Sequence, residues 1–593
     1  MPLFLLSLFS MNRLVCLLFT LAMPLLHFGQ IDSNFKIDSL LITYRTGGNL
    51  DTVDKQSQVF SASFPLLNKG TTQLFPKPEL LFSPELGILQ ENYFQNNRLI
   101  FSALPHIGFS YVFGAQGTQR LTFNYEQSFR QGFLVNATIK RDKTTGFLRN
   151  SAIEGGAYEL KIGRAAKRFS FLFSGVYANE NRSWNGGIVA DSLADIYAPT
   201  LIPVRKENAL TQNRNIHLNL LNRFSFWGDS INNVGFLTEH HFSNYRRVYS
   251  EEDTLYNLYT FVYQDSTNSN DTLQTNYLQN AAAFYLKKNN FALQTGARAN
   301  NWNYLTYNLK RDTLEIDIYE KVDYKWKQFD LQHNGYLNLI GAGRGMRLQT
   351  SVSTPIIQGK LILSHLLSNE YPQLFQRHFS SNNVVYQLSS LELQKRQSIK
   401  LELQNPMGWK GVSLSYNLMT YKKNFFYDAT VQTWRNDLSI SDGTLHVISL
   451  NSALHLKNLH FYPGYKFVSM NNVIQFHPQH TLFGRLMFQG GIFKARKLKF
   501  ALGVDFALSS KFKSLNFIPQ MSILDPLSMQ TSGYQNAFIN AGVFTSFEVE
   551  TFRFFIRMDN LGTFWTDKTT SLINGYTFPS TQIKLGVTWD FWN

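Results

Sequence analysis

The sequence predicts an all-β protein, a transmembrane antiparallel β-barrel of about 16–20 strands with a short irregular N-terminal extension. Charged residues make up only 16% of the 593 residues, whereas soluble domains contain about 25%. Aromatic residues reach 15%, with 51 Phe and 28 Tyr, and such rings favour pleated, half-buried surfaces. Hydrophobic residues make up 44%, yet the mean hydropathy is only −0.20. Apolar and polar side chains are therefore interleaved, as in a sheet whose two faces meet different environments.

Alternation with a period of two residues recurs from about residue 105 to the end of the chain. In LKFALGVDFAL (498–508) every second residue is apolar, and the residues between are small or charged. Similar alternation is found at 107–113, 121–125, 133–139, 169–177, 216–226, 412–418, 552–559 and 583–591. Strands of about 9–11 residues are long enough to cross a bilayer at a tilt. No run of about 18 apolar residues follows the N-terminus, which excludes a helical membrane protein.

The connections are predicted to alternate between short turns and long external loops. The expected turns are 288–290, 341–345 and 457–458, and the expected loops are 178–214, 246–276 and 509–536. GAGRG at 341–345 is glycine-rich like a phosphate cradle, but no helix pattern follows it, which favours a hairpin turn. At roughly 25–30 residues for each strand and its connection, a barrel of about 490 residues holds 16–20 strands and encloses a lumen.

The N-terminal region divides into two parts. Residues 1–29 look like a signal peptide, because Arg13 precedes an apolar run, with Met11 as an alternative start. Cys16, the only cysteine, would leave with this peptide; an uncleaved anchor and a lipoprotein cysteine are the alternatives. Residues 30–104 are rich in proline and lack alternation, so we expect an irregular periplasmic or lumenal extension. The transmembrane β-barrel is predicted over residues 105–593.

Charge and motifs argue against several classes of function. The net charge is +15, but Lys and Arg are spread along the chain, so nucleic acid is not an expected partner. The histidines that could bind a metal are His240, His241, His446, His455 and His460. They lack zinc-type spacing, and the oxygen-rich segment 265–276 lacks the spacing of a calcium loop. No short motif places a nucleophile beside a base. We therefore expect no enzyme activity, no metal and no cofactor.

Three segments near the two ends of the predicted barrel carry a more specific pattern. NGYTFPSTQIKLGVTWDFWN (574–593) has a Tyr-x-x-Pro step that leads into a last alternating strand, and FFIRMDNLGTFW (554–565) precedes it. Together with LPHIGFSYVFGAQGTQRLTFNYEQSF (104–129) they resemble the closing and early strand pairs of the putative porin family of Bacteroidota. TonB-dependent receptors close with a similar Asn-Leu step, and this chain ends in Asn593 instead of an aromatic residue. The resemblance implies an outer-membrane barrel with pore activity.

The leading hypothesis is a porin of the cell outer membrane that lets small solutes or ions diffuse passively through a water-filled lumen. Seven ionisable residues on the polar faces of predicted strands are expected to line that lumen, where the four cationic ones favour anions and the three aspartates temper that preference. They are Arg553, Arg557, Asp559, Lys499, Asp505, Lys584 and Asp590. The expected partners are outer-membrane lipid and lipopolysaccharide, small solutes or ions, and the barrel-assembly machinery.

Two alternatives belong to other functional classes. The first is a gated or specific outer-membrane transporter, and the second is a structural or secretion-associated barrel that binds a partner. A TonB-dependent receptor needs a folded plug ahead of its barrel, and residues 30–104 are too short and irregular to supply one. That length argument favours the porin.

Overall fold

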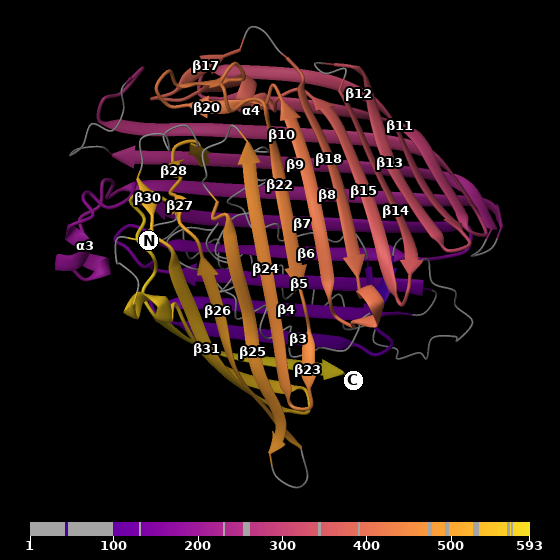
Figure 1. The fold of residues 1–593 in the computed structure, drawn as a ribbon. Coiled ribbons are helices and arrows are strands. Elements are labelled where there is room, and N and C mark those ends of the chain that lie inside the picture. The colour runs from indigo at the N-terminus through magenta and orange to yellow at the C-terminus, as the bar shows by residue number, and fades with distance from the viewer. Residues whose placement is uncertain are drawn as a thin grey trace, which may run out of the picture.

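The chain folds into one closed barrel (Figure 1). The computed structural model describes residues 42–44, 99–129, 132–228, 232–252, 261–341, 345–388, 392–471, 477–492, 497–525, 533–565, 570 and 573–592. The barrel has 22 antiparallel strands, and it closes where the first strand pairs with the last, with His106 opposite Trp592. The predicted all-β barrel is confirmed, with more strands than the predicted 16–20.

The strands follow one another around the barrel in sequence order. They are β3 (His106–Gly114), β4 (Thr118–Ser128), β5 (Phe133–Thr144), β6 (Ile153–Arg164), β7 (Phe169–Trp184), β8 (Ala209–Gly228), β9 (Asn232–Glu252), β10 (Asn268–Lys288), β11 (Phe291–Thr306), β12 (Leu309–Trp326), β13 (Phe329–Ile340), β14 (Met346–Ile356), β15 (Gly359–Glu370), β18 (Gln394–Gln404), β19 (Ser413–Lys422), β22 (Gly443–Asn451), β24 (Leu459–Asn471), β25 (His480–Ile492), β26 (Leu498–Ser509), β31 (Phe538–Val549), β32 (Phe552–Asp559) and β33 (Gln582–Trp592). The short β23 (Leu454–Leu456) continues β22, because both pair with β24.

Exposure identifies the outer face of the strands. On β26, Leu502 is 52% exposed, whereas its neighbours Gly503 and Asp505 are buried. The same contrast runs along β31 and along β33 as far as Thr588, where every second residue is buried. The apolar residues of the alternating pattern therefore face outward, where a barrel of this kind contacts lipid, and the polar and small residues face the lumen.

Several strands are longer than the expected 9–11 residues, but most connections at the turn end are very short, and these short connections explain the larger strand number. β9 and β10 each have 21 residues. The end of β10 near the connection carries polar outward residues such as Asn270, Thr272 and Gln274, whereas Ala282 and Phe284 face outward near its other end. Parts of the predicted loops 178–214 and 246–276 are therefore strand, since these long hairpins continue beyond the apolar belt. Each strand with its connection takes roughly 22 residues, fewer than the assumed 25–30.

Long connections gather at one end of the barrel, which we call the loop end, and the barrel's own termini lie at the opposite, turn end. The long connections are 185–208, 253–267, 371–393, 423–442, 510–537 and 560–581. The turns at 289–290 and 457–458 are confirmed, and Asn289 and Lys457 adopt positive φ there. β13 and β14 form the hairpin predicted around 341–345, although residues 342–344 lie outside the described residues.

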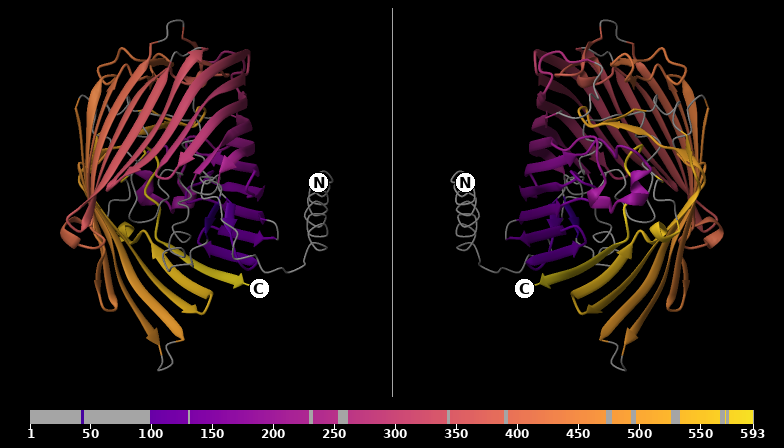
Figure 2. Two further views of the ribbon diagram at one scale, coloured as in Figure 1. Left: turned by 90° about the vertical axis from the view of Figure 1, so that its right-hand side faces the viewer. Right: turned by 90° about the vertical axis from the view of Figure 1, so that its left-hand side faces the viewer.

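Short helices and strands lie within the long connections. They are the helices α3 (Leu193–Ile196) and α4 (Leu374–Arg377) and the strands β16 (His378–Ser380), β17 (Val385–Gln387), β20 (Phe426–Asp428), β21 (Thr433–Arg435), β27 (Phe512–Lys513), β28 (Asn516–Ile518), β29 (Ile523–Asp525) and β30 (Tyr534–Gln535). In the two views of Figure 2, magenta and yellow connections lie between the purple and the orange walls of the barrel. None of the helices described is long and apolar enough to cross a membrane.

A small part of the predicted N-terminal extension is described. β1 (Ile42–Tyr44) pairs in parallel with β2 (Leu99–Phe101). The backbone N–H of Ile100 donates to Asn136 Oδ1 at 2.8 Å, and Asn136 Nδ2 donates back to the Ile100 carbonyl at 3.0 Å. Asn136 belongs to the inner face of β5, so β2 lies against the lumen side of the wall. The predicted signal peptide, Cys16 and most of residues 30–104 lie outside the described residues.

Candidate functional site

The candidate site is the interior of the barrel, and one connection reaches across it. The segment 510–525 leaves β26 and meets β9, which lies twelve strands away in one direction around the barrel and ten in the other. Arg247 of β9 donates through Nη2 to the carbonyl oxygens of Pro519 at 2.8 Å and Gln520 at 2.6 Å. Because β9 and β26 are on opposite sides of the ring, this segment spans the lumen.

Gln520 ties the crossing segment to further elements. Its Nε2 donates to Asp271 Oδ2 on β10 at 3.5 Å and to Ser381 Oγ and Asn383 Oδ1 at 3.2 Å each. Ser381 and Asn383 belong to the connection between β15 and β18. These buried polar contacts hold two connections and one wall together, and removing one partner from such a set leaves others unsatisfied.

Apolar packing continues the same structure. We call the described parts of 185–208, 371–388, 423–442, 510–525 and 573–581 the loop layer. One buried cluster joins Phe379 and Tyr386 to Trp434, Met521 and the wall residue Tyr304. A second cluster joins the connections that follow β26 and β32 to the wall, and its buried members are Trp184, Ala209, Tyr249, Ala507, Phe512, Phe538, Ile573, Tyr576 and Phe578. The loop layer therefore has a core of its own inside the barrel.

Backbone contacts and neutral tyrosines reinforce the loop layer. Ile188 N–H donates to the Gly575 carbonyl at 2.7 Å, and Asn574 N–H donates to the Leu515 carbonyl at 2.8 Å. Burial raises the pKa of Tyr386 and of Tyr576 above the ordinary value. Both hydroxyls stay neutral, and Tyr386 donates to the carbonyl of Phe375 while accepting from Trp434 Nε1 at 2.9 Å.

The predicted lumen residues lie together on the inner face of β25 to β33, which we call the charged wall. Arg557 donates through Nη2 to Asp505 Oδ2 and through Nε to Asp559 Oδ1, both at 2.6 Å. Lys584 Nζ lies 2.9 Å from Asp559 Oδ2, and Arg485 Nε lies 2.6 Å from Asp505 Oδ1. Arg557 and Asp505 are each 1% exposed in their side chains. The charges are therefore paired and dry.

Small residues and one ring make this network possible. Asp505 on β26 and Arg557 on β32 are separated by β31, where Gly542 stands opposite Asp505. The ring of Phe544 on β31 lies 5.0 Å from the Arg485 guanidinium and 5.7 Å from that of Arg557. A Cβ at Gly503 would lie 2.4 Å from Phe544, so glycine is what lets the ring lie flat against β26.

The remaining predicted residues occupy the ends of the charged wall. Glu548 bridges Lys499 Nζ at 2.8 Å and Arg553 Nε at 2.7 Å. Lys499 is largely exposed, whereas Arg553 is buried. Asp590 Oδ1 accepts from His106 Nε2 at 2.9 Å across the closing pair of strands. All seven residues thus lie on one wall, and each has a carboxylate, a cationic or, for Asp590, an imidazole partner.

The inner face of β8 to β13 has a different chemistry, and we call it the aromatic wall. A row of rings crosses neighbouring strands: His217 lies 5.6 Å from His241, His241 lies 5.7 Å from Tyr277, and Tyr277 lies 4.1 Å from Trp302. Tyr277 donates to Asn300 Oδ1 at 3.0 Å. These four rings are half-buried, so they combine exposed ring surface with hydrogen-bonding groups.

Comparison with known proteins places the barrel in a family. The family described as "Putative porin" matches residues 86–593. The chain belongs to the putative porin family. No curated protein matches the chain. The predicted family is thereby confirmed, and an origin in Bacteroidota stays a prediction.

Solved structures share the fold of this porin-family chain. The ferric-catecholate import receptor Fiu of E. coli K12 in its closed form has a TM-score of 0.58 at 11% identity, covering 82% of each chain. The FrpB iron transporter of Neisseria meningitidis has 0.58 at 10% identity, with 82% of each chain covered. The siderophore receptor PirA of Acinetobacter baumannii has 0.57 at 9% identity, with 82% and 80% covered. At these identities the likeness concerns the fold alone.

The other candidate ligand groups of the porin-family barrel are dispersed. Among the described residues no group of three or more His, Cys, Asp or Glu side chains is placed to hold a metal. His240 bonds Asn280, His446 bonds the Tyr416 hydroxyl, and His455 meets His460 at 2.6 Å between their Nδ1 atoms. In 265–276, Asp265 accepts from the backbone of Thr267, which lowers the pKa of its carboxyl.

The loop layer was missed at the sequence level, yet a signal for it exists. The connections HFSSNNVVY (378–386) and FFYDATVQTW (425–434) contain large rings among turn-forming residues. Aromatic rings are stabilised when they are removed from water, so a long connection that contains several of them is expected to pack against other apolar groups.

Proposed function

We propose that this porin-family barrel is a gated or solute-specific outer-membrane transporter that its own loop layer holds closed at rest. The observation that carries the proposal is the segment 510–525, which Arg247 fastens to the opposite wall. In a diffusion pore, water would occupy the part of the lumen that this segment crosses. The predicted alternative thus has more support than the predicted open pore, because connections can close a barrel that lacks a folded N-terminal plug.

The charged wall takes a sealing role in this proposal. Paired charges at 1% exposure present little net field to a passing anion, because each charge is compensated within 3 Å. The seven predicted residues hold strands β25 to β33 together, and solute passes on the side of the aromatic wall.

The remaining sequence predictions join the proposal unchanged. Residues 1–29 direct export and are cleaved, the barrel-assembly machinery inserts the chain, and lipid and lipopolysaccharide contact the outward apolar face. The similar receptors are described as importing iron or binding siderophores. We carry over gated import of a small solute and not iron, since the likeness is one of fold.

Single-channel conductance in planar bilayers tests the proposal. Refolded wild-type protein is expected to give rare or no steps, and Arg247→Ala is expected to raise the open probability because the crossing segment loses its anchor. The matched control is Arg246→Ala, the preceding residue on β9, whose side chain is exposed on the other face. Replacing residues 512–535 by a short Gly-Ser linker is expected to give steady steps.

The outcome that overturns the proposal is equally definite. A wild-type barrel that conducts steadily, at a level that neither Arg247→Ala nor the excision changes, is an open pore. A heat-modifiability assay on every variant establishes that each barrel has folded.

A further inference from the structure

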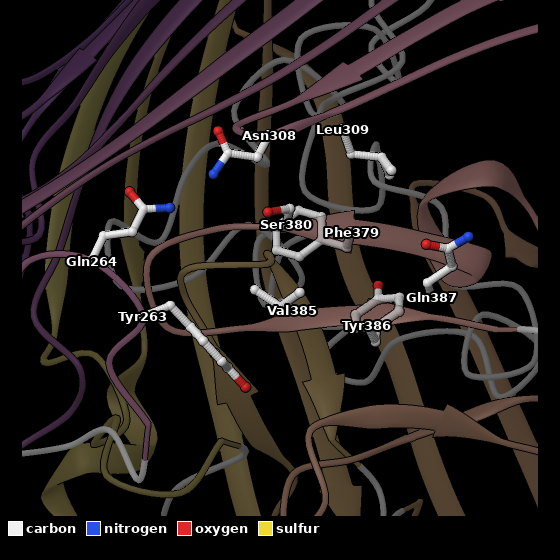
Figure 3. Close-up of a pocket in the computed structure, with 9 residues that line it drawn as sticks. All are labelled: Tyr263, Gln264, Asn308, Leu309, Phe379, Ser380, Val385, Tyr386 and Gln387. Atoms are coloured by element: carbon white, nitrogen blue, oxygen red, sulfur yellow. The ribbon is translucent and has the colours of Figure 1, made fainter.

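A cavity opens in the loop layer beside the hairpin of β16 and β17 (Figure 3). Its volume is about 350 Å³, at the small end of the range of ligand pockets. Three segments line it: the stretch before β10 with Tyr263 and Gln264, the β11–β12 turn with Asn308, and the hairpin itself. It lies at the loop end, the side from which an external solute would arrive.

Backbone contacts hold these three segments in place. Tyr263 N–H donates to the Asn382 carbonyl at 2.8 Å, and Tyr307 N–H donates to the Ser380 carbonyl at 3.3 Å. The hydroxyl of Tyr304 on β11 donates to the His378 carbonyl at 2.7 Å. The cavity is therefore formed in advance, which reduces the entropy lost when a ligand binds.

The lining is uncharged and rich in amides. None of the nine lining residues in Figure 3 carries a formal charge. Gln264, Asn308 and Gln387 have exposed side-chain amides, and each amide both donates and accepts hydrogen bonds. Tyr263, 51% exposed, adds a ring face. Hydroxyl groups also donate and accept, so this set matches a small ring that carries several of them.

We propose that this cavity is the outer binding site for an uncharged, hydroxyl-rich solute of about one or two sugar rings. Phe379 and Tyr386 form part of the lining and also belong to the buried cluster of the loop layer. A solute bound on the hairpin therefore contacts the same residues that help close the lumen. The chemistry of the site stands on the cavity, whereas its role as the first step of import rests on the proposed function.

Binding to the full-length protein in detergent tests the proposal, with isothermal titration calorimetry as the measurement. The probes are glucose and sucrose, compared at slightly acidic pH with glucuronate and glucosamine, which keep the sugar ring and carry a charge. Uncharged sugars are expected to bind saturably and more tightly than either charged analogue. Gln387→Leu and Asn308→Leu are each expected to weaken binding at least about fivefold, because a directional hydrogen bond is lost. Gln212→Leu, an exposed glutamine on the outer face of β8, is the matched control.

Three results would overturn the site: no saturable binding of either sugar, equal or tighter binding of a charged analogue, or affinities that the two cavity variants leave unchanged. Conductance and binding are separate measurements. A wild-type barrel that is open in bilayers but still binds sucrose through Gln387 would refute the closed state and keep the site. A barrel that is closed in bilayers but binds no sugar would support the closed state and refute the site.

Discussion

The charged wall and the aromatic wall are built from the same alternation, yet they meet different interiors. On the charged wall, inward residues such as Asp505 and Arg557 reach each other across β31 and are buried. On the aromatic wall, Tyr277 and Trp302 stack in a row and stay half-buried. The aromatic wall also holds a close ion pair, Arg298 with Asp317 at 2.6 Å. The difference teaches that an inward polar side chain becomes structural where partners of opposite charge stand within 3 Å, and stays available to solute where rings and amides stand instead.

The largest expected effect comes from breaking the charged wall. Arg557→Met leaves Asp505 and Asp559 buried with one cation each, so we expect the barrel to lose about 3–5 kcal/mol of stability. Urea unfolding in lipid vesicles, followed by the heat-modifiable gel shift, measures the loss. Arg141→Met is the control, because the Arg141–Glu154 pair is exposed and should contribute under about 1 kcal/mol. Equal losses of stability in the two variants would show that the buried ion pairs stabilise the barrel no more than an exposed pair does.

A smaller effect is expected where the charged wall packs tightly. Gly503→Ala brings a Cβ to 2.4 Å from the Phe544 ring, whereas Gly533→Ala meets nothing within 4 Å. We expect the first to cost about 1–3 kcal/mol and the second to stay within about 0.5 kcal/mol. The same unfolding assay compares them. A tolerated alanine at Gly503 would mean that the ring can leave the guanidinium groups without loss.

The aromatic wall should respond in transport and not in stability. Trp302→Ala removes one ring of the row, so uptake of an uncharged sugar into proteoliposomes is expected to fall about two- to tenfold. Trp326→Ala is the control, since Trp326 is exposed on the outward, apolar face of β12. If both substitutions lower uptake alike, the row has no particular part in the solute path.

The smallest expected effect is local and depends on pH. His477, in the connection before β25, is buried and hydrogen-bonded to the Pro478 carbonyl. Burial, and next the positive charge of Lys466, lower the pKa of His477 to about 3. A depressed histidine pKa means that the unfolded segment binds a proton that the folded one does not. Local stability is therefore present above about pH 6.5 and declines as pH falls toward 3.

Hydrogen exchange at the backbone amides of His477 and Gln479, compared at pH 5 and pH 7.5, measures this decline after correction for the intrinsic rate. His477→Asn should remove the pH dependence of protection. Protection that is the same at both pH values would contradict the burial of a neutral imidazole.

Much of the fold was predictable because alternation is a local property. The series from Leu498 to Leu508 states which side chains share a face without any knowledge of the neighbours, and β26 follows it residue by residue. Strand number was less predictable, since β9 and β10 continue past the apolar belt into polar sequence that resembles loop. The family resemblance rested on segments 104–129, 554–565 and 574–593, and the family match includes all three.

The site was predicted only in part. Sequence placed Arg557, Asp505 and Lys584 on polar faces but could not supply their partners, because pairing across β31 depends on register and on Gly542. The cavity beside β16 and β17 combines residues about 120 positions apart, among them Tyr263 and Tyr386. No short motif describes such a site.

The sequence by itself determined an outward-apolar, inward-polar barrel, because side chains one residue apart on a strand must face opposite solvents. Only the tertiary structure decided that the lumen is crossed. Segment 510–525 meets Arg247 on the far side of a 22-strand ring, and a contact of that kind depends on closure of the whole sheet. The physical reason is the distance in sequence between interacting residues. Alternation depends only on neighbours within one strand, whereas the partner of a charged side chain or of a long connection depends on which strand the closed barrel places opposite to it.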